Sequence, residues 1–242
     1  MILKPPNGGY YFVIGNSFWG DTMFKKNITI AIDGPAGAGK STIAKRVAEA
    51  LSIEYLDTGA MYRALTLKVL KLGLDPMSTD DVINAMTDTS IDFKDNHIYL
   101  DDIRVDKQIR ENIINKNVSY VAQIKEVREG MVKLQREIAR TKSIIMDGRD
   151  IGTVVLPDAD FKFFLTASVE ERALRRYKEL LEKGEDGISY DQIKKEIENR
   201  DRIDSTRKVS PLMESKDAYR LDTTNKTIDE CVEEVISIVR RR

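Results

Sequence analysis

The sequence predicts an α/β protein built as a three-layer sandwich, in which helices cover both faces of a central parallel sheet. Short apolar runs alternate with segments of helical spacing after residue 27, a pattern typical of β–α–β units. A glycine-rich loop follows the first apolar run and opens the first helical segment. The length of 242 residues suits one such domain with an inserted subdomain.

The first two strands and helices are predicted from apolar runs and helical periodicity. Residues 28–32 form an apolar run that ends at Asp33 and predicts a buried parallel strand. Residues 40–51 carry apolar side chains at helical spacing. A second strand is expected at residues 53–56 and a second helix at residues 60–72.

The pattern changes after residue 77, where we expect an inserted subdomain. Ser78-Thr-Asp-Asp81 is typical of a helix N-terminus. Three short alternating runs separated by turn residues then predict a small antiparallel sheet at residues 91–93, 97–100 and 103–105. The following stretch, residues 106–140, has helical spacing with an expected break near Asn117.

The remaining elements return to the β–α pattern. Strands are expected at residues 143–146, 161–165 and 218–222, and helices at about 168–183, 189–204 and 227–241. Gly184 and Gly187 lie between the first two of these helices and predict the tip of a lid.

Composition excludes several classes of protein. Lysine and arginine number 39 against 40 aspartate and glutamate, a formal net charge of −1, so no electrostatic reason favours a nucleic-acid or membrane partner. The single cysteine, Cys231, excludes a disulfide within the chain, and the single histidine, His97, is expected on the surface or in a turn rather than in a zinc or catalytic site. No apolar run approaches the roughly 18 residues that span a bilayer. We expect a cytoplasmic monomer.

The glycine-rich loop predicts the binding of a nucleoside triphosphate. It fits the phosphate-binding pattern GxxxxGK[ST] in the required context between a buried strand and a helix. Its backbone N–H groups and the positive end of the following helix can surround phosphates, while Lys40 reaches the β- and γ-phosphates and the Ser41 hydroxyl ligates Mg²⁺. The predicted ATP-binding residues are Gly34, Pro35, Ala36, Gly37, Ala38, Gly39, Lys40, Ser41 and Thr42.

A carboxylate at another strand end is expected to complete the Mg²⁺ site. Asp147 closes the apolar run at residues 144–146 and is predicted to hold the metal with Ser41, partly through water. Asp33, beside the loop itself, is the alternative.

Scattered arginines favour phosphoryl transfer to a small acceptor. The guanine-reading Asn-Lys-x-Asp tetrapeptide of GTPases does not occur in the sequence. Such a kinase must clamp two polyanions and exclude water, and arginines on mobile lids can do both. Arg63 and Arg149 follow strand ends, while Arg172 and Arg176 share one helix face. The predicted catalytic groups are Lys40, Arg149, Arg172 and Arg176.

Over residues 28–240 the chain resembles the bacterial cytidylate kinase family, which belongs to the nucleoside monophosphate kinase superfamily of P-loop proteins. The segments that carry the resemblance are Ile32-Asp-Gly-Pro-Ala-Gly-Ala-Gly-Lys-Ser41, Leu56-Asp-Thr-Gly-Ala-Met-Tyr-Arg63, Asp147-Gly-Arg-Asp-Ile-Gly-Thr-Val-Val155, Pro157-Asp-Ala159, and Arg200-Asp201 through Arg207 with Pro211-Leu212. The resemblance implies transfer of the γ-phosphate of ATP to CMP or dCMP in pyrimidine nucleotide metabolism, with Mg²⁺ as cofactor.

The resemblance also implies roles for individual residues. The phosphate of CMP would be bound by Thr58, Arg63, Arg149 and Arg207. The cytosine edge would be read by Ser119, Arg128 and Asp150, and the sugar would be contacted by Arg200 and Asp204. Tyr62, on the segment after the second strand, joins the predicted CMP-binding set. The family often has serine where this chain has Thr58, and the hydroxyl is retained.

The predicted domain organisation combines composition, the change of pattern after residue 77 and the resemblance. Residues 1–22, rich in Gly, Asn and aromatic side chains, are expected to be a poorly ordered extension or added segment. The kinase domain is expected at residues 23–242. Its parts are a core (23–77, 119–167 and 208–242), a monophosphate-binding insert at about 78–118 and a lid at about 168–207.

Two alternative functions remain open from the residues. One is a P-loop kinase of another small metabolite, such as shikimate or dephospho-coenzyme A. The other is a non-catalytic module that senses ATP. The size of the insert and the Asp-Gly-Arg-Asp segment argue against the first, and the many strand-end arginines argue against the second.

Overall fold

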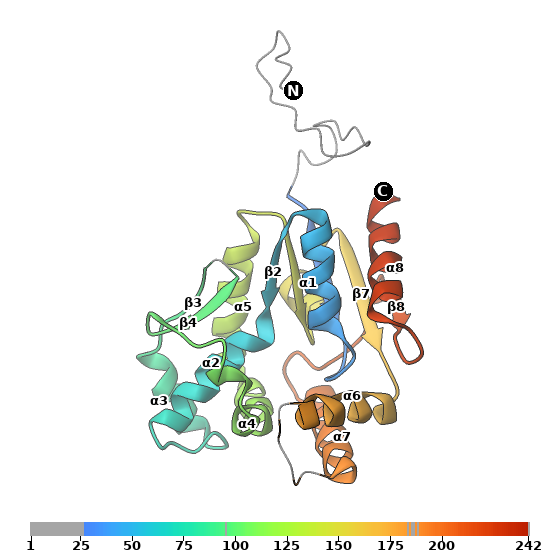
Figure 1. The fold of residues 1–242 in the computed structure, drawn as a ribbon. Coiled ribbons are helices and arrows are strands. Elements are labelled where there is room, and N and C mark those ends of the chain that lie inside the picture. Colours follow the sequence, from blue (N-terminus) through green and yellow to red (C-terminus); the bar gives the residue numbers. More distant parts are fainter. Residues whose placement is uncertain (1–26, 95, 183, 185–186, 188, 242) are drawn as a thin grey trace, which may run out of the picture.

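The computed structural model describes residues 27–94, 96–182, 184, 187 and 189–241. The predicted N-terminal extension at residues 1–22 therefore lies outside the described residues. Figure 1 shows a sheet in the upper part of the molecule and two groups of helices below it.

The central sheet has five parallel strands in the order β2-β6-β1-β7-β8, so β2 and β8 are its two edges. The strands are β1 (Thr29–Asp33), β2 (Glu54–Asp57), β6 (Ile144–Gly148), β7 (Phe161–Thr166) and β8 (Tyr219–Asp222). All five were expected from apolar runs, and each lies within one or two residues of its predicted bounds. Because the strands are parallel, their carboxyl ends lie at one edge of the sheet, and Asp33, Asp57 and Asp147 lie at that edge.

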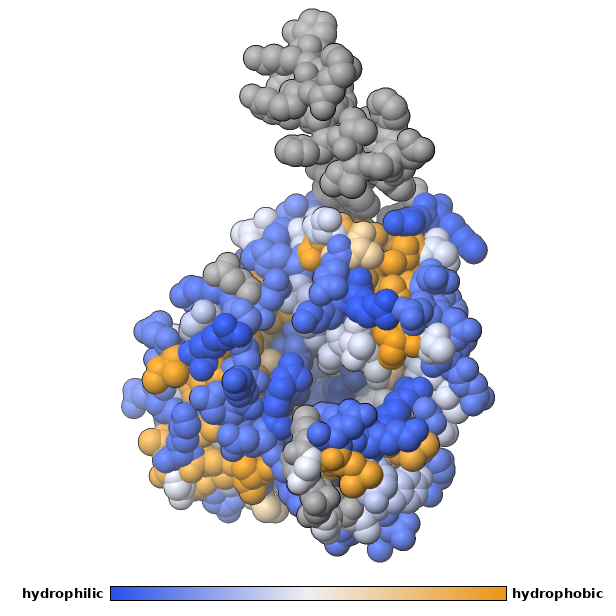
Figure 2. Space-filling model, in the orientation of Figure 1, coloured by the Kyte–Doolittle hydropathy of each residue, from blue (hydrophilic) through white to orange (hydrophobic). Residues whose placement is uncertain are grey.

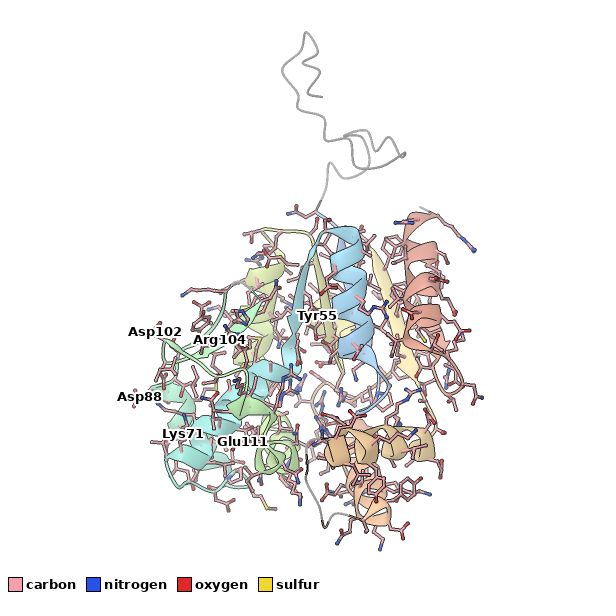
Figure 3. All side chains as sticks on the ribbon, viewed as in Figure 1. Tyr55, Lys71, Asp88, Asp102, Arg104 and Glu111 are labelled. Atoms are coloured by element: carbon pink, nitrogen blue, oxygen red, sulfur yellow. The ribbon has the colours of Figure 1, made fainter. Side chains whose placement is uncertain are left out.

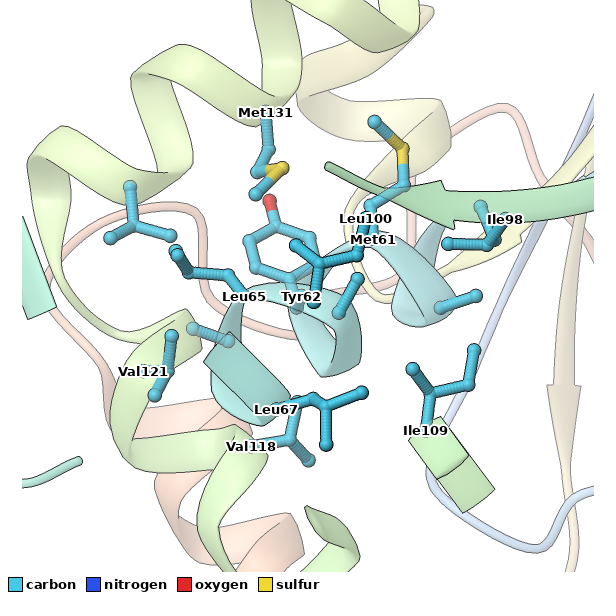
Figure 4. Close-up of a cluster of buried hydrophobic side chains, with 14 of the residues drawn as sticks. Met61, Tyr62, Leu65, Leu67, Ile98, Leu100, Ile109, Val118, Val121 and Met131 are labelled. Atoms are coloured by element: carbon cyan, nitrogen blue, oxygen red, sulfur yellow. The ribbon is translucent and has the colours of Figure 1, made fainter. Parts of the chain in front are cut away.

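Helices cover both faces of the sheet, which confirms the three-layer prediction (Figure 1). On one face, α1 (Lys40–Leu51) and α8 (Ile228–Arg240) bury an apolar cluster against β1 and β7. On the other, α2 (Thr58–Lys71) and α5 (Lys125–Ala139) bury a second and larger cluster. The second cluster extends into the insert, so the insert is anchored to the core by apolar packing (Figure 4).

The insert contains the antiparallel sheet expected from the sequence. Its three strands are β3 (Ile91–Lys94), β4 (His97–Leu100) and β5 (Ile103–Arg104), paired antiparallel in that order. They follow α3 (Thr79–Thr87) and precede the 3₁₀ turn η1 (Gln108–Arg110) and α4 (Asn112–Ala122). His97 lies on β4 with Nδ1 2.8 Å from the carboxylate of Asp106, away from the catalytic candidates.

The helix break expected near Asn117 is wrong. Asn117 lies inside α4, where its amide donates to the carbonyl of Ile113 and so satisfies the backbone locally. The break falls at Gln123 and Ile124, between α4 and α5. No glycine or proline marks it. Instead, the Arg128 guanidinium donates to the Ala122 carbonyl at 3.1 Å and caps the end of α4.

A helical pair, α6 (Val169–Glu182) and α7 (Tyr190–Thr206), forms the second group of helices below the sheet. The two helices share a small apolar cluster of their own around Ala173, Leu180 and Ile193. This cluster is separate from the two clusters that pack on the sheet, a property expected of a unit that moves as a body. The division into core, insert and lid stays a prediction. Across the described part of the chain, no helix is both long and apolar enough to cross a membrane.

Candidate active site

The phosphate-binding loop takes its shape from glycines in backbone conformations that other residues avoid. Gly34 has φ 147°, and a Cβ at this position would lie 2.0 Å from the Leu165 carbonyl oxygen. Gly37 has φ 78°, and a Cβ at this position would lie 3.0 Å from the Cβ of Arg172. The loop ends at Lys40, the first residue of α1, whose ammonium donates to the Pro35 carbonyl at 2.8 Å. The Lys40 side chain is thus folded back onto its own loop.

Two adjoining cavities open at the carboxyl edge of the sheet. The larger, of about 650 Å³, lies between the phosphate-binding loop, α4 and the α6–α7 pair. The smaller, of about 180 Å³, lies toward α2 and the end of β6. Both are lined by Lys40, Arg63 and Arg200, so the two cavities meet at three cations. Figure 2 shows the molecule hollowed below the sheet, with hydrophilic residues around the opening.

Most of the predicted site residues line these cavities. The larger cavity contains the predicted residues Ala36, Gly37, Gly39, Lys40, Ser41, Thr42, Arg63, Ser119, Arg176 and Arg200. The smaller adds Thr58, Tyr62, Arg128, Asp147, Arg149, Asp150, Asp204 and Arg207. Gly34, Pro35, Ala38 and Arg172 line neither cavity. Gly34, Pro35 and Ala38 are part of the phosphate-binding loop itself.

Ser41 and Asp147 meet at the wall of the smaller cavity, as expected for a metal site. The Ser41 hydroxyl donates to Asp147 Oδ2 at 2.9 Å, and Tyr55 donates its hydroxyl to Oδ1 at 2.8 Å. Burial and the Asp57 carboxylate raise the pKa of Asp147 to about 6. Two hard oxygen donors beside a phosphate site fit Mg²⁺, which keeps waters and nucleotide oxygens as its other ligands. Among the described residues no cluster of three or more His, Cys, Asp or Glu could hold a metal by itself.

Asp33, the alternative metal ligand, has a different role in the structure. Both of its carboxylate oxygens accept backbone N–H groups, from Ile151 and Gly152, each at 2.7 Å. These bonds secure the π-helical turn at Ile151–Val155, an element that was not predicted from the sequence. Burial raises the pKa of Asp33 to about 7. Asp33 thus ties the start of the phosphate-binding loop to the segment that carries Arg149.

One side of the smaller cavity resembles a phosphate clamp. The Thr58 hydroxyl donates to the Asp147 backbone carbonyl at 2.8 Å. The Arg63 guanidinium pairs with Asp57, and Arg149 donates through Nε to Asp204 at 2.8 Å. The carboxylates hold both guanidinium groups in place at the cavity wall, so positive charge is arranged before any anion arrives.

The other side of the smaller cavity is a buried polar network. Arg128, only 2% exposed, pairs with Asp150, which also lies 3.6 Å from the Arg207 guanidinium. The Arg128 guanidinium stands 5.4 Å from the centre of the Tyr62 ring. The buried Nε of Arg128 and the hydroxyl of Tyr62 have no hydrogen-bond partner within the described protein atoms. A flat ligand with its own polar edge can satisfy such groups.

The arginines of the α6–α7 pair separate in space. Arg200 lines both cavities, and burial together with the neighbouring Arg149 lowers its pKa to about 10. Arg176 lines the larger cavity and pairs with Glu179 at 2.8 Å. Arg172, although four residues from Arg176, is turned into the protein and buried. Sharing a helix face therefore did not bring both side chains into the cavity.

Arg172 connects the phosphate-binding loop to α7. Its guanidinium donates to the carbonyls of Ala36 and Ala167, each at 3.0 Å, and pairs with Asp201 at 2.7 Å. Its charge and donors are thus engaged by the loop backbone and by α7. In this arrangement Arg172 holds loop and helix together instead of facing the space above Lys40.

Four residues at the site carried no assigned role in the sequence analysis: Asp57, Tyr55, Arg110 and Arg175. Asp57 caps α2 and balances Arg63, and its position at a strand end was a usable signal. Arg175 lines the larger cavity and donates to Thr223, and it lies between Arg172 and Arg176 in the sequence. Arg110 comes from the insert, where no local pattern singles it out.

Burial and nearby guanidinium groups make Lys40 a weak base. Burial, with Arg149 as the next largest cause, lowers the pKa of Lys40 from its ordinary 10.5 to about 7. An anionic polyphosphate beside the ammonium would favour its charged form and raise this pKa again. A free enzyme that holds Lys40 largely neutral at pH 8 must then take up a proton when nucleotide binds.

We expect ATP binding at pH 8 without divalent metal to take up close to one proton per site. The sign follows from the pKa of Lys40, which is about 7 in the free protein and higher in the complex, so affinity falls as pH rises above 7. Calorimetry in buffers of different ionisation enthalpy measures the uptake. The uptake should disappear in Lys40→Met, and its persistence there would assign the proton to another group.

Comparisons with known proteins agree with the geometry. The sequence model of the family described as "Cytidylate kinase" matches residues 30–241. A cytidylate kinase of Clostridioides difficile (strain 630) is 55% identical over 211 residues, which cover 87% of this chain and 97% of that protein. One of Alkaliphilus oremlandii (strain OhILAs) is 54% identical over 213 residues, 88% and 98% of the two chains. The structure of an uncharacterized protein from Eubacterium ventriosum ATCC 27560 has a TM-score of 0.51 at 15% identity, covers 89% of this chain and 100% of its own, and shares the fold.

Proposed function

The chain belongs to the cytidylate kinase family, and from this premise we propose how its two cavities carry out the reaction. The protein is an ATP-dependent CMP kinase, a phosphotransferase that converts ATP and CMP to ADP and CDP. The observation that carries the proposal is that a larger and a smaller cavity meet at Lys40, Arg63 and Arg200. We propose that dCMP also accepts the phosphoryl group.

The larger cavity takes ATP. Its triphosphate would lie along the backbone N–H groups of the phosphate-binding loop, with Lys40 released from the Pro35 carbonyl to contact the β- and γ-phosphates. Ser41 and Asp147 would hold Mg²⁺ with the nucleotide. Mg²⁺ would offset the charge of the phosphate oxygens. Arg176 would contact the triphosphate from α6.

The smaller cavity takes the monophosphate. Thr58, Arg63, Arg149 and Arg207 would bind its phosphate, and Arg200 and Asp204 its sugar. Tyr62 provides the apolar wall under the guanidinium of Arg128. The acceptor phosphate would therefore stand against the same three cations that border the ATP cavity.

Selection of cytosine would rest on the buried Arg128–Asp150 pair and on Ser119. The exocyclic amine of cytosine donates hydrogen bonds and suits the Asp150 carboxylate, whereas uracil presents a carbonyl oxygen at that position. A carboxylate facing that oxygen, deep in a site where Asp150 is 4% exposed, would lack a donor and repel it. The penalty for an unpaired buried polar group exceeds that for a lost apolar contact, so selectivity should be strong.

Phosphoryl transfer needs positioning and positive charge more than acid–base chemistry. An oxygen of the CMP phosphate attacks the γ-phosphorus while the bond to the β–γ bridging oxygen breaks and ADP leaves. The acceptor phosphate is largely ionised near neutral pH, so no general base is assigned. Lys40, Arg149 and Arg200 would supply the positive charge around the transferring group. Closure of the insert and the α6–α7 pair would exclude water and so limit ATP hydrolysis.

The family assignment argues against a kinase of another metabolite and against a sensor that binds ATP without transferring it. The smaller cavity is lined by Arg149 after β6, Arg63 of α2 and Arg200 of α7. This arrangement also supports phosphoryl transfer, because a protein that only senses ATP needs cations around one phosphate group. A cytoplasmic location and a monomeric state stay predictions of the sequence.

A coupled assay of ADP release tests the function directly. Purified protein with ATP and Mg²⁺ should release ADP rapidly with CMP, and also with dCMP. With UMP or AMP we expect kcat/KM at least about 100-fold lower, because the buried polar groups are left unpaired. Without acceptor, release should be close to background. Equal rates with CMP, UMP and AMP would contradict the proposed cytosine site, and equal rates with and without acceptor would contradict transfer.

A further inference from the structure

Tyr55 lies outside every set of residues assigned above, yet it contacts the centre of the site. It is on β2, an edge strand, and pairs in register with Ile145 of β6, two residues before Asp147. Because side chains alternate along a strand, the Tyr55 side chain lies on the same face of the sheet as Asp147. Figure 3 shows Tyr55 between β2 and α1, above the site.

The two oxygens of Asp147 are divided between two donors. Oδ1 accepts from the Tyr55 hydroxyl at 2.8 Å, and Oδ2 accepts from Ser41 at 2.9 Å. Ser41 and Asp147 line the cavities, whereas Tyr55 lines neither. The Tyr55 bond is therefore directed to the oxygen away from Ser41 and does not use a position that a ligand in the cavity could take.

We propose that Tyr55 is a positioning residue, which holds the Asp147 carboxylate in the orientation that binds Mg²⁺ with the nucleotide. The inference rests on the proposed function and extends it. The Ser41 hydroxyl can ligate the metal through a lone pair of its oxygen, and the bond from Tyr55 to Oδ1 would fix the other side of the carboxylate. Hydrogen bonds to the far side of a metal-binding group commonly set its orientation and its affinity.

Tyr55→Phe separates this role from packing. The Tyr55 ring packs against the apolar cluster under α1, and phenylalanine keeps that ring. The variant loses only the donor to Oδ1. In a site where Asp147 is 4% exposed, little water can replace that donor, so the carboxylate gains rotational freedom.

Metal binding is the direct readout. Free Mn²⁺, counted by its electron paramagnetic resonance signal in the presence of protein and ADP, gives the Kd of the metal in the ternary complex. We expect this Kd to rise about 10-fold in Tyr55→Phe, with ADP affinity measured without metal within twofold of wild type. The Mg²⁺ concentration for half-maximal activity should rise in parallel, while KM for CMP stays unchanged. Tyr219→Phe, on the opposite edge strand and 52% exposed, is the matched control and should change none of these values.

Two results would overturn the assignment. One is a metal Kd within twofold of wild type in Tyr55→Phe. The other is an equal loss of metal-free ADP affinity and of metal affinity, which would mean a general distortion of the loop. Failure of the proposed function looks different, because wild-type protein itself would then show no Mg²⁺-dependent phosphorylation of CMP.

Discussion

Replacing Lys40 with methionine is expected to lower kcat for CMP phosphorylation by at least about 1,000-fold, because a cation that stabilises the charge of the transferring phosphoryl group contributes about 10³-fold to 10⁵-fold. Lys40 lines both cavities, and its ammonium contacts the phosphate-binding loop at the Pro35 carbonyl. Methionine fills a similar volume without the charge. The transferring phosphoryl group would then lose a positive charge that lies beside it.

The fold should survive this substitution. Lys40 is 6% exposed, and its pKa of about 7 shows that the protein opposes the buried charge. The pKa of Lys40 is lower in the folded state than in the unfolded state, so its protonation destabilises the fold. This destabilisation is complete at pH values below the folded-state pKa and disappears as the pH rises toward the unfolded-state pKa. At pH 7 the thermal midpoint of Lys40→Met should thus equal or exceed that of wild type. The change therefore separates catalysis from stability.

Lys45→Met provides the matched control. Lys45 is on the same helix but on its exposed face, so the same chemical change there should leave kcat and the thermal midpoint unaltered. Steady-state rates of ADP formation and thermal denaturation are sufficient to compare the three proteins. Turnover of Lys40→Met close to that of wild type would refute the role of Lys40, and loss of cooperative unfolding would refute its separation from stability.

Local sequence patterns predicted the core because they reflect local physics. A parallel sheet covered on both faces needs continuous apolar strands, and the runs at residues 28–32 and 143–146 have that property. The phosphate-binding loop is recognised because Gly34 and Gly37 adopt conformations that few residues allow. Spacing and residue type are enough in such cases.

Features created by tertiary contacts were missed. The break between α4 and α5 has no glycine or proline, and the Arg128 guanidinium, which caps it, is six residues from Ala122. The π-helical turn at Ile151–Val155 depends on Asp33, which is 118 residues from Ile151 in sequence. Helix spacing placed Arg172 beside Arg176, but the first guanidinium is held by loop carbonyls and Asp201. Contacts of this range are visible only in three dimensions.

Arg149→Met is expected to lower kcat/KM for CMP by about 100-fold to 1,000-fold, with a smaller effect on KM for ATP. Arg149 lines the smaller cavity only, so it should act on the acceptor and on the transferring group. Its partner Asp204 keeps Arg207 at 3.8 Å and Arg200 at 4.0 Å, so the substitution does not leave a buried carboxylate without a cation. The thermal midpoint should therefore change little.

The same substitution should alter the titration of Lys40, which gives a second and independent readout. Arg149 is the largest electrostatic cause, after burial, of the low pKa of Lys40. Without it, Lys40 is protonated to higher pH, and nucleotide binding at pH 8 should take up less proton than in wild type. Arg202→Met, on the exposed side of α7, should change neither quantity. Reduced activity with undiminished proton uptake would place Arg149 in contact with the acceptor but outside the charge network of Lys40. Retention of full activity would remove Arg149 from the mechanism.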